Sequence, residues 1–301
     1  LSRTLIPKLP PNYLSRKHIF HLLENQAPST TIVLAPAGYG KTSLVAEWAA
    51  THKDRVIWLT ITDSDSLEDM SSLFIQATRN IIPNFAPWFE TESHIRPVEI
   101  VRRWGNELLA KRLDFILVID NLRENTKRDV DIAVRLVEQF PPNLHFVSIR
   151  RDSIENVYPT FASRGSLSVI STNQLAFNEF ELNSLASMFN VSLENRGNLE
   201  TLTGAHGWPS AVSMLLHHMA KNQSQINFEN LVASESEPLR ALATTVIQSL
   251  DASTKSIITS LSVVQEFNHE LAQIILGDSY SFDQLNSIAL EGHYFSQSSD
   301  L

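Results

Sequence analysis

Residues 35 to 43 concentrate the side-chain types best suited to binding a charged ligand. This stretch fits the pattern G-x-x-x-x-G-K-[ST], with Ala35 in place of the first glycine. Glycines let the backbone turn so that successive N–H groups converge on phosphate oxygens, and a helix that starts there adds the positive end of its dipole. We therefore predict a phosphate-binding loop, with ligand contacts from Pro36, Ala37, Gly38, Tyr39, Gly40, Lys41, Thr42 and Ser43.

Three residues could complete this loop as a site for a nucleoside triphosphate. Lys41 would reach the β- and γ-phosphates, and the Thr42 hydroxyl would coordinate Mg²⁺. Asp120 ends the apolar run 115–119, where its carboxylate would hold the same ion. The next residue, Asn121, has an amide that cannot accept a proton from water. The usual general base is therefore missing at this position, and hydrolysis is left open.

Two arginines, Arg150 and Arg151, follow the apolar run 146–149. If this run is a strand next to the phosphate loop, a guanidinium at its end could sense the γ-phosphate. We expect Arg150 to fill this role, together with Lys41 and Asp120 as the catalytic set. The alternative is that both arginines are solvated residues at the start of a loop.

The surrounding pattern predicts strands that alternate with helices. Contiguous rather than alternating apolar residues favour buried strands for the first four of five short runs. These runs cover residues 30–35, 55–61, 115–120, 145–149 and 167–170. Helical spacing occupies residues 43–51, 67–82, 98–112 and 130–140, and three prolines predict a surface loop over 83–97. The order favours an α/β fold with a parallel sheet covered on both faces.

The strand signal stops after residue 170, and the remaining pattern is helical. Short helices are predicted over 177–190, 199–202 and 208–220, with Asn178 as an N-cap and Glu181 at the third helical position. Polar stretches at 221–225 and 234–238 separate them from helical spacing over 239–290. We therefore predict three domains, which cover residues 1–172, 173–235 and 236–301.

Composition limits the partners of the chain. Its 301 residues carry 33 acidic and 24 basic side chains, a net charge of −9, which argues against a protein that coats nucleic acid. The absence of cysteine excludes disulfides, thiolate zinc sites and cysteine catalysis, and it fits a reducing cytoplasm. No apolar run is long enough to cross a bilayer, so we expect a soluble cytoplasmic protein without a membrane partner. The ends at Leu1 and Leu301 lead us to expect a part of something longer.

Several motifs together resemble the STAND-type signal-transduction ATPases, specifically the MalT-like large ATP-binding regulators of the LuxR family. They occur in family order, and the PAGYGKT core and the GWP tripeptide are the specific ones. The motifs are APAGYGKTSLVAEWAA (35–50), FILVIDN (115–121), SIRRD (148–152), LAFNEFE (175–181) and HGWPSAV (206–212).

The resemblance implies an ASCE/STAND-type P-loop NTPase domain, a small helical domain and a winged-helix-like domain, which together clamp ADP in a resting state. An unknown inducer would promote exchange for ATP, and the ATP-bound form would self-associate and hydrolyse ATP slowly. Pro209 would pack on the base or ribose, although a proline is also common at a helix start. Leu14 and Arg16 resemble the motif that lines the adenine pocket, or mark a plain helix start. DNA would bind only through a C-terminal domain that this chain lacks.

Three alternatives remain open. A GTP-binding switch is suggested by TKRD at 126–129, a variant of a guanine-recognition motif, although it follows Asp120 too closely. A STAND protein with another output, such as an antiphage or death effector, carries the same motifs. A nucleotide-binding scaffold that never hydrolyses also fits the amide of Asn121.

Overall fold

The computed structural model divides into two compact units, Leu1–Leu34 with Gly40–Gln174, and Ala35–Tyr39 with Leu175–Leu301. Each unit is considered by itself. The structure describes residues 2–25, 27–62, 65–92, 94–122, 127–151, 158–163, 165–193, 202, 205–222, 244, 252–264, 267–277 and 285.

The first unit is built on a parallel sheet of five strands in the order β2-β3-β4-β1-β5. All five predicted strands are confirmed: β1 Ser29–Leu34, β2 Val56–Thr60, β3 Phe115–Asp120, β4 Leu144–Arg150 and β5 Ser166–Ile170. Every residue of β3 and β4 is buried, as expected for contiguous apolar strands with helices on both faces. Because β4 pairs with both β1 and β3, it separates the strand before the phosphate loop from the strand that ends at Asp120.

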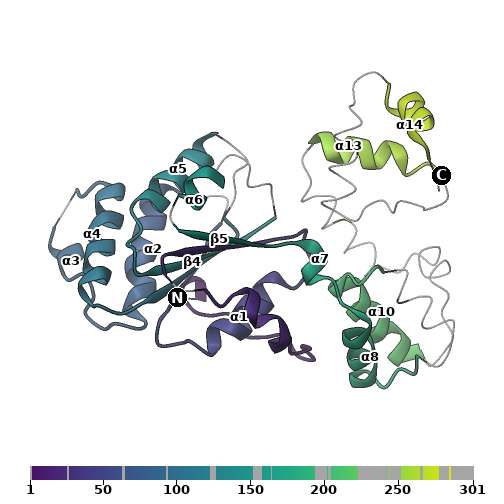
Figure 1. The fold of residues 1–301 in the computed structure, drawn as a ribbon, viewed down its shortest axis with the longest axis horizontal. Coiled ribbons are helices and arrows are strands. Elements are labelled where there is room, and N and C mark those ends of the chain that lie inside the picture. Colours follow the sequence, from purple (N-terminus) through teal and green to yellow (C-terminus); the bar gives the residue numbers. More distant parts are fainter. Residues whose placement is uncertain are drawn as a thin grey trace. The chain divides into compact units, whose positions relative to one another are not determined.

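Helices cover both faces of this sheet (Figure 1). One face packs against α2 and α4 through aromatic side chains, with ring centroids 4.9 Å apart for Phe74 and Trp104 and 5.1 Å apart for Phe140 and Phe146. Trp48 of α1 lies on the other face, 5.8 Å from the ring of His145. The helices and 3₁₀ helices of the unit are η1 Ser2–Thr4, η2 Lys17–Leu22, α1 Lys41–Ala50, α2 Leu67–Arg79, α3 Trp88–Thr91, α4 Pro97–Ala110, α5 Lys127–Glu138, α6 Tyr158–Ala162 and, at its boundary, α7 Thr172–Leu175.

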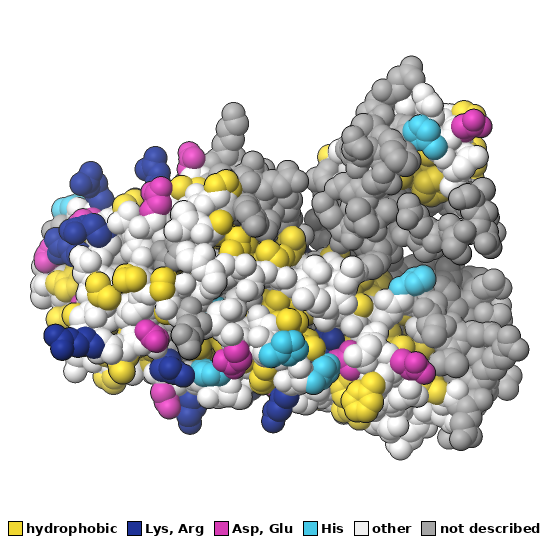
Figure 2. Space-filling model, viewed as in Figure 1, with side chains coloured by type: hydrophobic (Ala, Val, Ile, Leu, Met, Phe, Trp, Pro, Cys, Tyr) yellow, Lys and Arg dark blue, Asp and Glu magenta, His cyan; other side chains and the backbone are white. Residues whose placement is uncertain are grey.

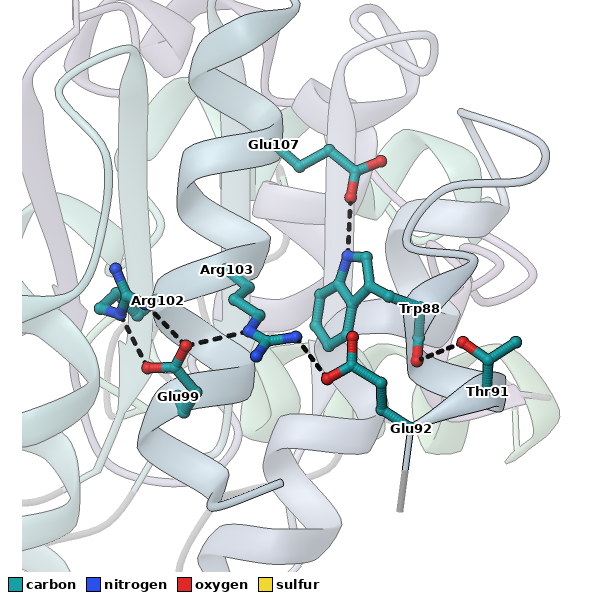
Figure 3. A network of polar contacts seen from close by, with 7 residues as sticks. All are labelled: Trp88, Thr91, Glu92, Glu99, Arg102, Arg103 and Glu107. Atoms are coloured by element: carbon teal, nitrogen blue, oxygen red, sulfur yellow. Dashed lines mark hydrogen bonds and ion pairs between the residues drawn. The ribbon is translucent and has the colours of Figure 1, made fainter. Parts of the chain in front are cut away.

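The predicted loop over 83–97 is wrong in one part, because it contains the short helix α3. Figure 3 shows how side chains of α4 hold it: Glu107 accepts a hydrogen bond from the Trp88 indole at 3.1 Å, and Arg103 lies 5.3 Å from the ring centre of Trp88. Arg103 also bonds Glu92 at 2.8 Å and Glu99 at 2.9 Å. Tertiary partners outside the segment therefore stabilise a helix that its own periodicity does not predict.

The described part of the second unit contains four longer helices: α8 Glu179–Met188, α10 Pro209–Asn222, α13 Ala252–Leu261 and α14 His269–Leu276. The predicted cap of α8 is confirmed, because Asn178 and Glu181 form a reciprocal capping box. The helices α13 and α14 share a small core of Ile257, Leu261, Ala272 and Leu285. The predicted helix at 199–202 lies outside the described residues except for Leu202, as does most of the span 223–251. The three domain boundaries stay predictions.

Helix length and surface charge bear on two classes of partner, membranes and nucleic acids. Among the described residues, no helix is long and apolar enough to cross a membrane. On the face shown in Figure 2, the basic side chains of the first unit are interspersed with acidic ones. The mixed charge on this face does not form the one-sided basic patch that proteins use to bind a nucleic-acid backbone.

A buried imidazole sits at the edge of the sheet opposite to the phosphate loop. His145 is 3% exposed, and its Nε2 lies 3.0 Å from the Thr31 hydroxyl. Burial lowers the pKa of His145 from 6.5 to about 4, and the charge of His52 acts in the same direction. Above about pH 4, the neutral form of the ring is therefore favoured in the folded protein.

We predict that the first unit loses stability as the pH falls from 6.5 towards 4, because only the unfolded chain binds a proton at His145 in this range. At a pH one unit below 6.5, the loss is about 1.4 kcal/mol. Urea unfolding of the wild type and of His145→Gln measures it. The exposed His18 provides the control variant His18→Gln, which keeps the wild-type pH dependence. A wild-type pH profile in His145→Gln would contradict the prediction.

Candidate nucleotide-binding site

The phosphate loop joins β1 to α1, as predicted. Gly40 is the residue before α1 and has a φ of 72°, a left-handed conformation that glycine adopts without strain. The helix begins at Lys41, which is buried, and its first backbone hydrogen bond runs from the Leu44 N–H to the Gly40 carbonyl at 2.9 Å. The N-terminal end of an α-helix carries the positive end of the helix dipole, so a helix that begins at Lys41 suits an anion in front of it.

Thr42 and Asp120 meet in the first unit although they are 78 positions apart. The Thr42 hydroxyl lies 3.2 Å and 3.1 Å from the two carboxylate oxygens of Asp120. Asp120 is 8% exposed, and burial raises its pKa above the ordinary value, while the bond from Thr42 and the charge of Lys41 oppose this shift. A hydroxyl and a carboxylate are oxygen ligands of the kind that Mg²⁺ takes together with phosphate oxygens and water. This donor set fits the predicted ion.

Asn121 has a structural task in the turn after β3. Its φ is 68°, a left-handed conformation that asparagine tolerates better than most residues. Its side-chain amide donates to the Ile61 carbonyl at 3.1 Å, and its backbone N–H donates to the Ile149 carbonyl at 3.0 Å. The residue thereby joins the ends of β2, β3 and β4. This position calls for a donor, which a carboxylate is not.

Arg150 is the last residue of β4 and pairs in register with Leu34, the last residue of β1. The predicted neighbourhood of this strand end and the start of the phosphate loop is thus present. The Arg150 side chain is fully buried, with its guanidinium carbon 6.0 Å from the ring centre of Phe161, whereas Arg151 is exposed. The role of Arg150 in sensing the γ-phosphate stays a prediction.

The segment with Leu14 and Arg16 lies against α1. Arg16 is 4% exposed and precedes η2, and its backbone N–H donates to the carboxylate of Glu47 at 3.0 Å. Sequence reasoning missed Glu47, although one signal was available: a carboxylate within the apolar run LVAEWAA of the helix that follows the loop. Charged residues on a buried helix face need partners.

In the second unit, the residues around Pro209 contact the first half of the phosphate loop. The Ser210 N–H and hydroxyl donate to the Gly38 carbonyl at 3.1 Å and 2.9 Å. The Trp208 indole donates to the Ala37 carbonyl at 3.2 Å and stacks on Tyr39, with centroids 6.4 Å apart. Sequence reasoning singled out Pro209, which is buried and begins α10, but it missed the two flanking residues that bond the loop.

We predict that Gly38→Ala destabilises the protein more than Gly40→Ala. Both glycines have positive φ, but only at Gly38 would a Cβ meet another group, the Trp208 indole nitrogen at 2.6 Å. The left-handed conformation costs each variant about 1–2 kcal/mol, and Gly38→Ala also loses the bonds from Trp208 and Ser210. Thermal unfolding without ligand measures the difference. Gly40→Ala, whose Cβ would meet open space, controls for the strain alone. Equal losses at both loop glycines would refute the prediction.

A second acid at position 121 is predicted to weaken the fold. Asn121→Asp replaces the donor with a carboxylate oxygen near the Ile61 carbonyl, which should cost about 1–3 kcal/mol. Asn121→Gly, which keeps the backbone conformation and only removes the bond, should cost less. Urea unfolding of both variants above pH 6 tests this order, and a stability of Asn121→Asp equal to that of the wild type would contradict it.

Comparisons with known proteins concern the sequence similarity and the fold of the chain. No protein-family model matches the chain. It is 28% identical over 278 residues to the HTH-type transcriptional regulator MalT of Vibrio parahaemolyticus serotype O3:K6 (strain RIMD 2210633), in an alignment that covers 86% of this chain and 30% of that protein. The chain thus spans less than a third of the length of this curated relative.

A solved structure shows the same fold. The Signal Transduction ATPase with Numerous Domains (STAND) protein with a tetratricopeptide repeat sensor from Pyrococcus horikoshii aligns with a TM-score of 0.50 and 17% sequence identity, over 97% of this chain and 40% of that chain. This structural match shows that the strands and helices of the two proteins are arranged alike. The chain is thus a distant homologue of MalT that has the parallel α/β P-loop fold of the STAND ATPases.

Proposed function

We propose that the chain is the regulatory switch module of a bacterial signal-transduction ATPase that controls transcription. In this proposal ADP is bound in the resting state, ATP in the active state, and hydrolysis is slow. The observation that carries the proposal is the contact of Thr42 with Asp120. Thr42 follows Lys41 in the phosphate loop, so this contact places two oxygen ligands of the kind that Mg²⁺ prefers next to the loop.

The chemistry assigned to each residue follows from its position. Lys41 and the first-turn N–H groups of α1 neutralise phosphate charge, and Thr42 and Asp120 hold Mg²⁺, which spreads that charge further. Arg150, at the end of the strand beside β1, is the candidate sensor of the γ-phosphate. Asn121 contributes no base, which supports a slow switch over a rapid enzyme.

Contacts inside the second unit support coupling between nucleotide and helices. Trp208 and Ser210 bond carbonyls of Ala37 and Gly38, in the loop that is to hold the phosphates. A change in loop conformation on exchange of ADP for ATP would break or strain these bonds. The free energy of nucleotide exchange would then reach α10 directly, which is the differential contact that a switch requires.

Transcriptional output is proposed from the relative, which is an HTH-type transcriptional regulator. DNA binding, the inducer site and ATP-dependent self-association belong in this proposal to the longer protein. A STAND module with a non-transcriptional output remains the second candidate, because the described site is compatible with either output. For the GTP alternative, Thr126 of the TKRD motif lies outside the described residues, and Lys127 begins α5.

The proposal predicts that protein purified without added ligand releases ADP when denatured, as identified by chromatography and mass spectrometry. In calorimetry on nucleotide-free protein with Mg²⁺ present, ATP and ADP should each bind at least tenfold more tightly than GTP. Lys41→Ala removes a charge-assisted phosphate contact of about 1.5–3 kcal/mol and should weaken ATP binding by one to two orders of magnitude.

Lys111→Ala is the matched control, because Lys111 is an exposed lysine just after α4. It should bind ATP like the wild type. Phosphate release above the Lys41→Ala background separates a slow ATPase from a scaffold that never hydrolyses. If the denatured protein releases no nucleotide and titration shows no binding, the proposal is defeated. Tighter binding of GTP than of ATP would replace adenine by guanine as the recognised base.

A further inference from the structure

Glu47 is a buried carboxylate in the middle of α1. It is 8% exposed and stands between Ala46 and Trp48, both of which are buried. A carboxylate in such a place is costly unless hydrogen-bond donors surround it. The donors all come from one short stretch near the N-terminus of the chain.

Three donors converge on this carboxylate. The Tyr13 hydroxyl lies 3.0 Å from Oε2, the Arg16 backbone N–H lies 3.0 Å from the same oxygen, and the Ser15 hydroxyl lies 2.5 Å from Oε1. Residues 13 to 16 belong to no helix or strand. Their path is therefore fixed by a side chain of α1 rather than by a backbone ladder.

The next residue of α1 holds the far end of the same segment. The Trp48 indole donates to the Glu24 carboxylate at 2.7 Å, just after η2. Residues 13 to 24 are thus fastened to α1 at two points. The same helix begins at Lys41 in the phosphate loop, and six residues at 1.5 Å each place Glu47 roughly 9 Å along its axis. One rigid helix therefore spaces this segment from the phosphate-binding end.

We propose that Glu47 is a positioning residue for base recognition: it sets Leu14 and Arg16 at a fixed distance from the phosphate loop. The inference rests on the proposed nucleotide binding, with Leu14 and Arg16 as the base contacts that the family resemblance implies, and it deepens that proposal. Glu47 touches no part of the nucleotide in this proposal. It determines how well the base is held, and it leaves the contacts of Lys41 and Thr42 with the phosphates unchanged.

Comparing ligands with and without a base tests this division. Calorimetry measures the binding of Mg-ATP, Mg-GTP and Mg-tripolyphosphate to the wild type, Glu47→Ala and Glu47→Gln. Glu47→Ala should bind ATP at least tenfold more weakly and lose preference for ATP over GTP, while tripolyphosphate binding stays within twofold. Glu47→Gln should retain most ATP affinity, because its amide oxygen still accepts from Tyr13 and Arg16 and its NH₂ can donate to Ser15.

The matched control is Asp54→Ala, which removes an exposed carboxylate between α1 and β2 and should leave the ratio of ATP to tripolyphosphate affinity unchanged. If Glu47→Ala does not fold, the double variant Tyr13→Phe/Ser15→Ala decides, since it removes two donors and keeps the carboxylate. Equal weakening of ATP and tripolyphosphate, or no weakening of either, would overturn the role of Glu47. A wild type that binds tripolyphosphate but no nucleotide, or neither, would instead overturn the proposed function.

Discussion

The candidate site depends on the parallel pairing of β4 with β1 on one side and β3 on the other. This pairing brings the carboxyl ends of three strands to one edge of the sheet. The phosphate loop begins after β1 at this edge, and Asp120 and Arg150 are the last residues of β3 and β4. At this edge, the hydrogen bond from Thr42 to Asp120 joins the start of α1 to the end of β3. Because Asp120 is desolvated, its carboxylate is held at a cost that a bound cation would relieve. In the proposed function, Mg²⁺ would be the cation that offsets this cost.

The phosphate loop forms hydrogen bonds with other parts of the protein through its backbone carbonyls. In the second unit, Trp208 and Ser210 bond its carbonyls, whereas the N–H groups at the start of α1 belong to the first unit. The loop thus has two kinds of polar group with separate tasks. Its carbonyls bind protein, and its N–H groups suit an anion. In the proposed switch, these contacts link the loop to the helix α10.

Much of the fold follows from local pattern. The five strands, the helices between them and the cap of α8 at Asn178 are each specified by apolar spacing or by a residue type within a few positions. The helix α3 was not predicted from local pattern, because its stability comes from contacts with Glu107 and Arg103 of α4. In the site, Lys41, Thr42 and Asp120 could be predicted because loop chemistry and a strand end restrict their types.

The sequence by itself determined the alternation of strands and helices, the phosphate loop and the residue types that suit a nucleotide and Mg²⁺. Only the tertiary structure decided the strand order, the donors of Glu47 from 31 to 34 positions away, and the bond from Trp208 to a carbonyl 171 positions away. The physical reason is that helix and strand periodicity arises from neighbours along the chain. A buried carboxylate or a loop carbonyl, by contrast, takes whichever donor the folded chain brings within 3 Å or so.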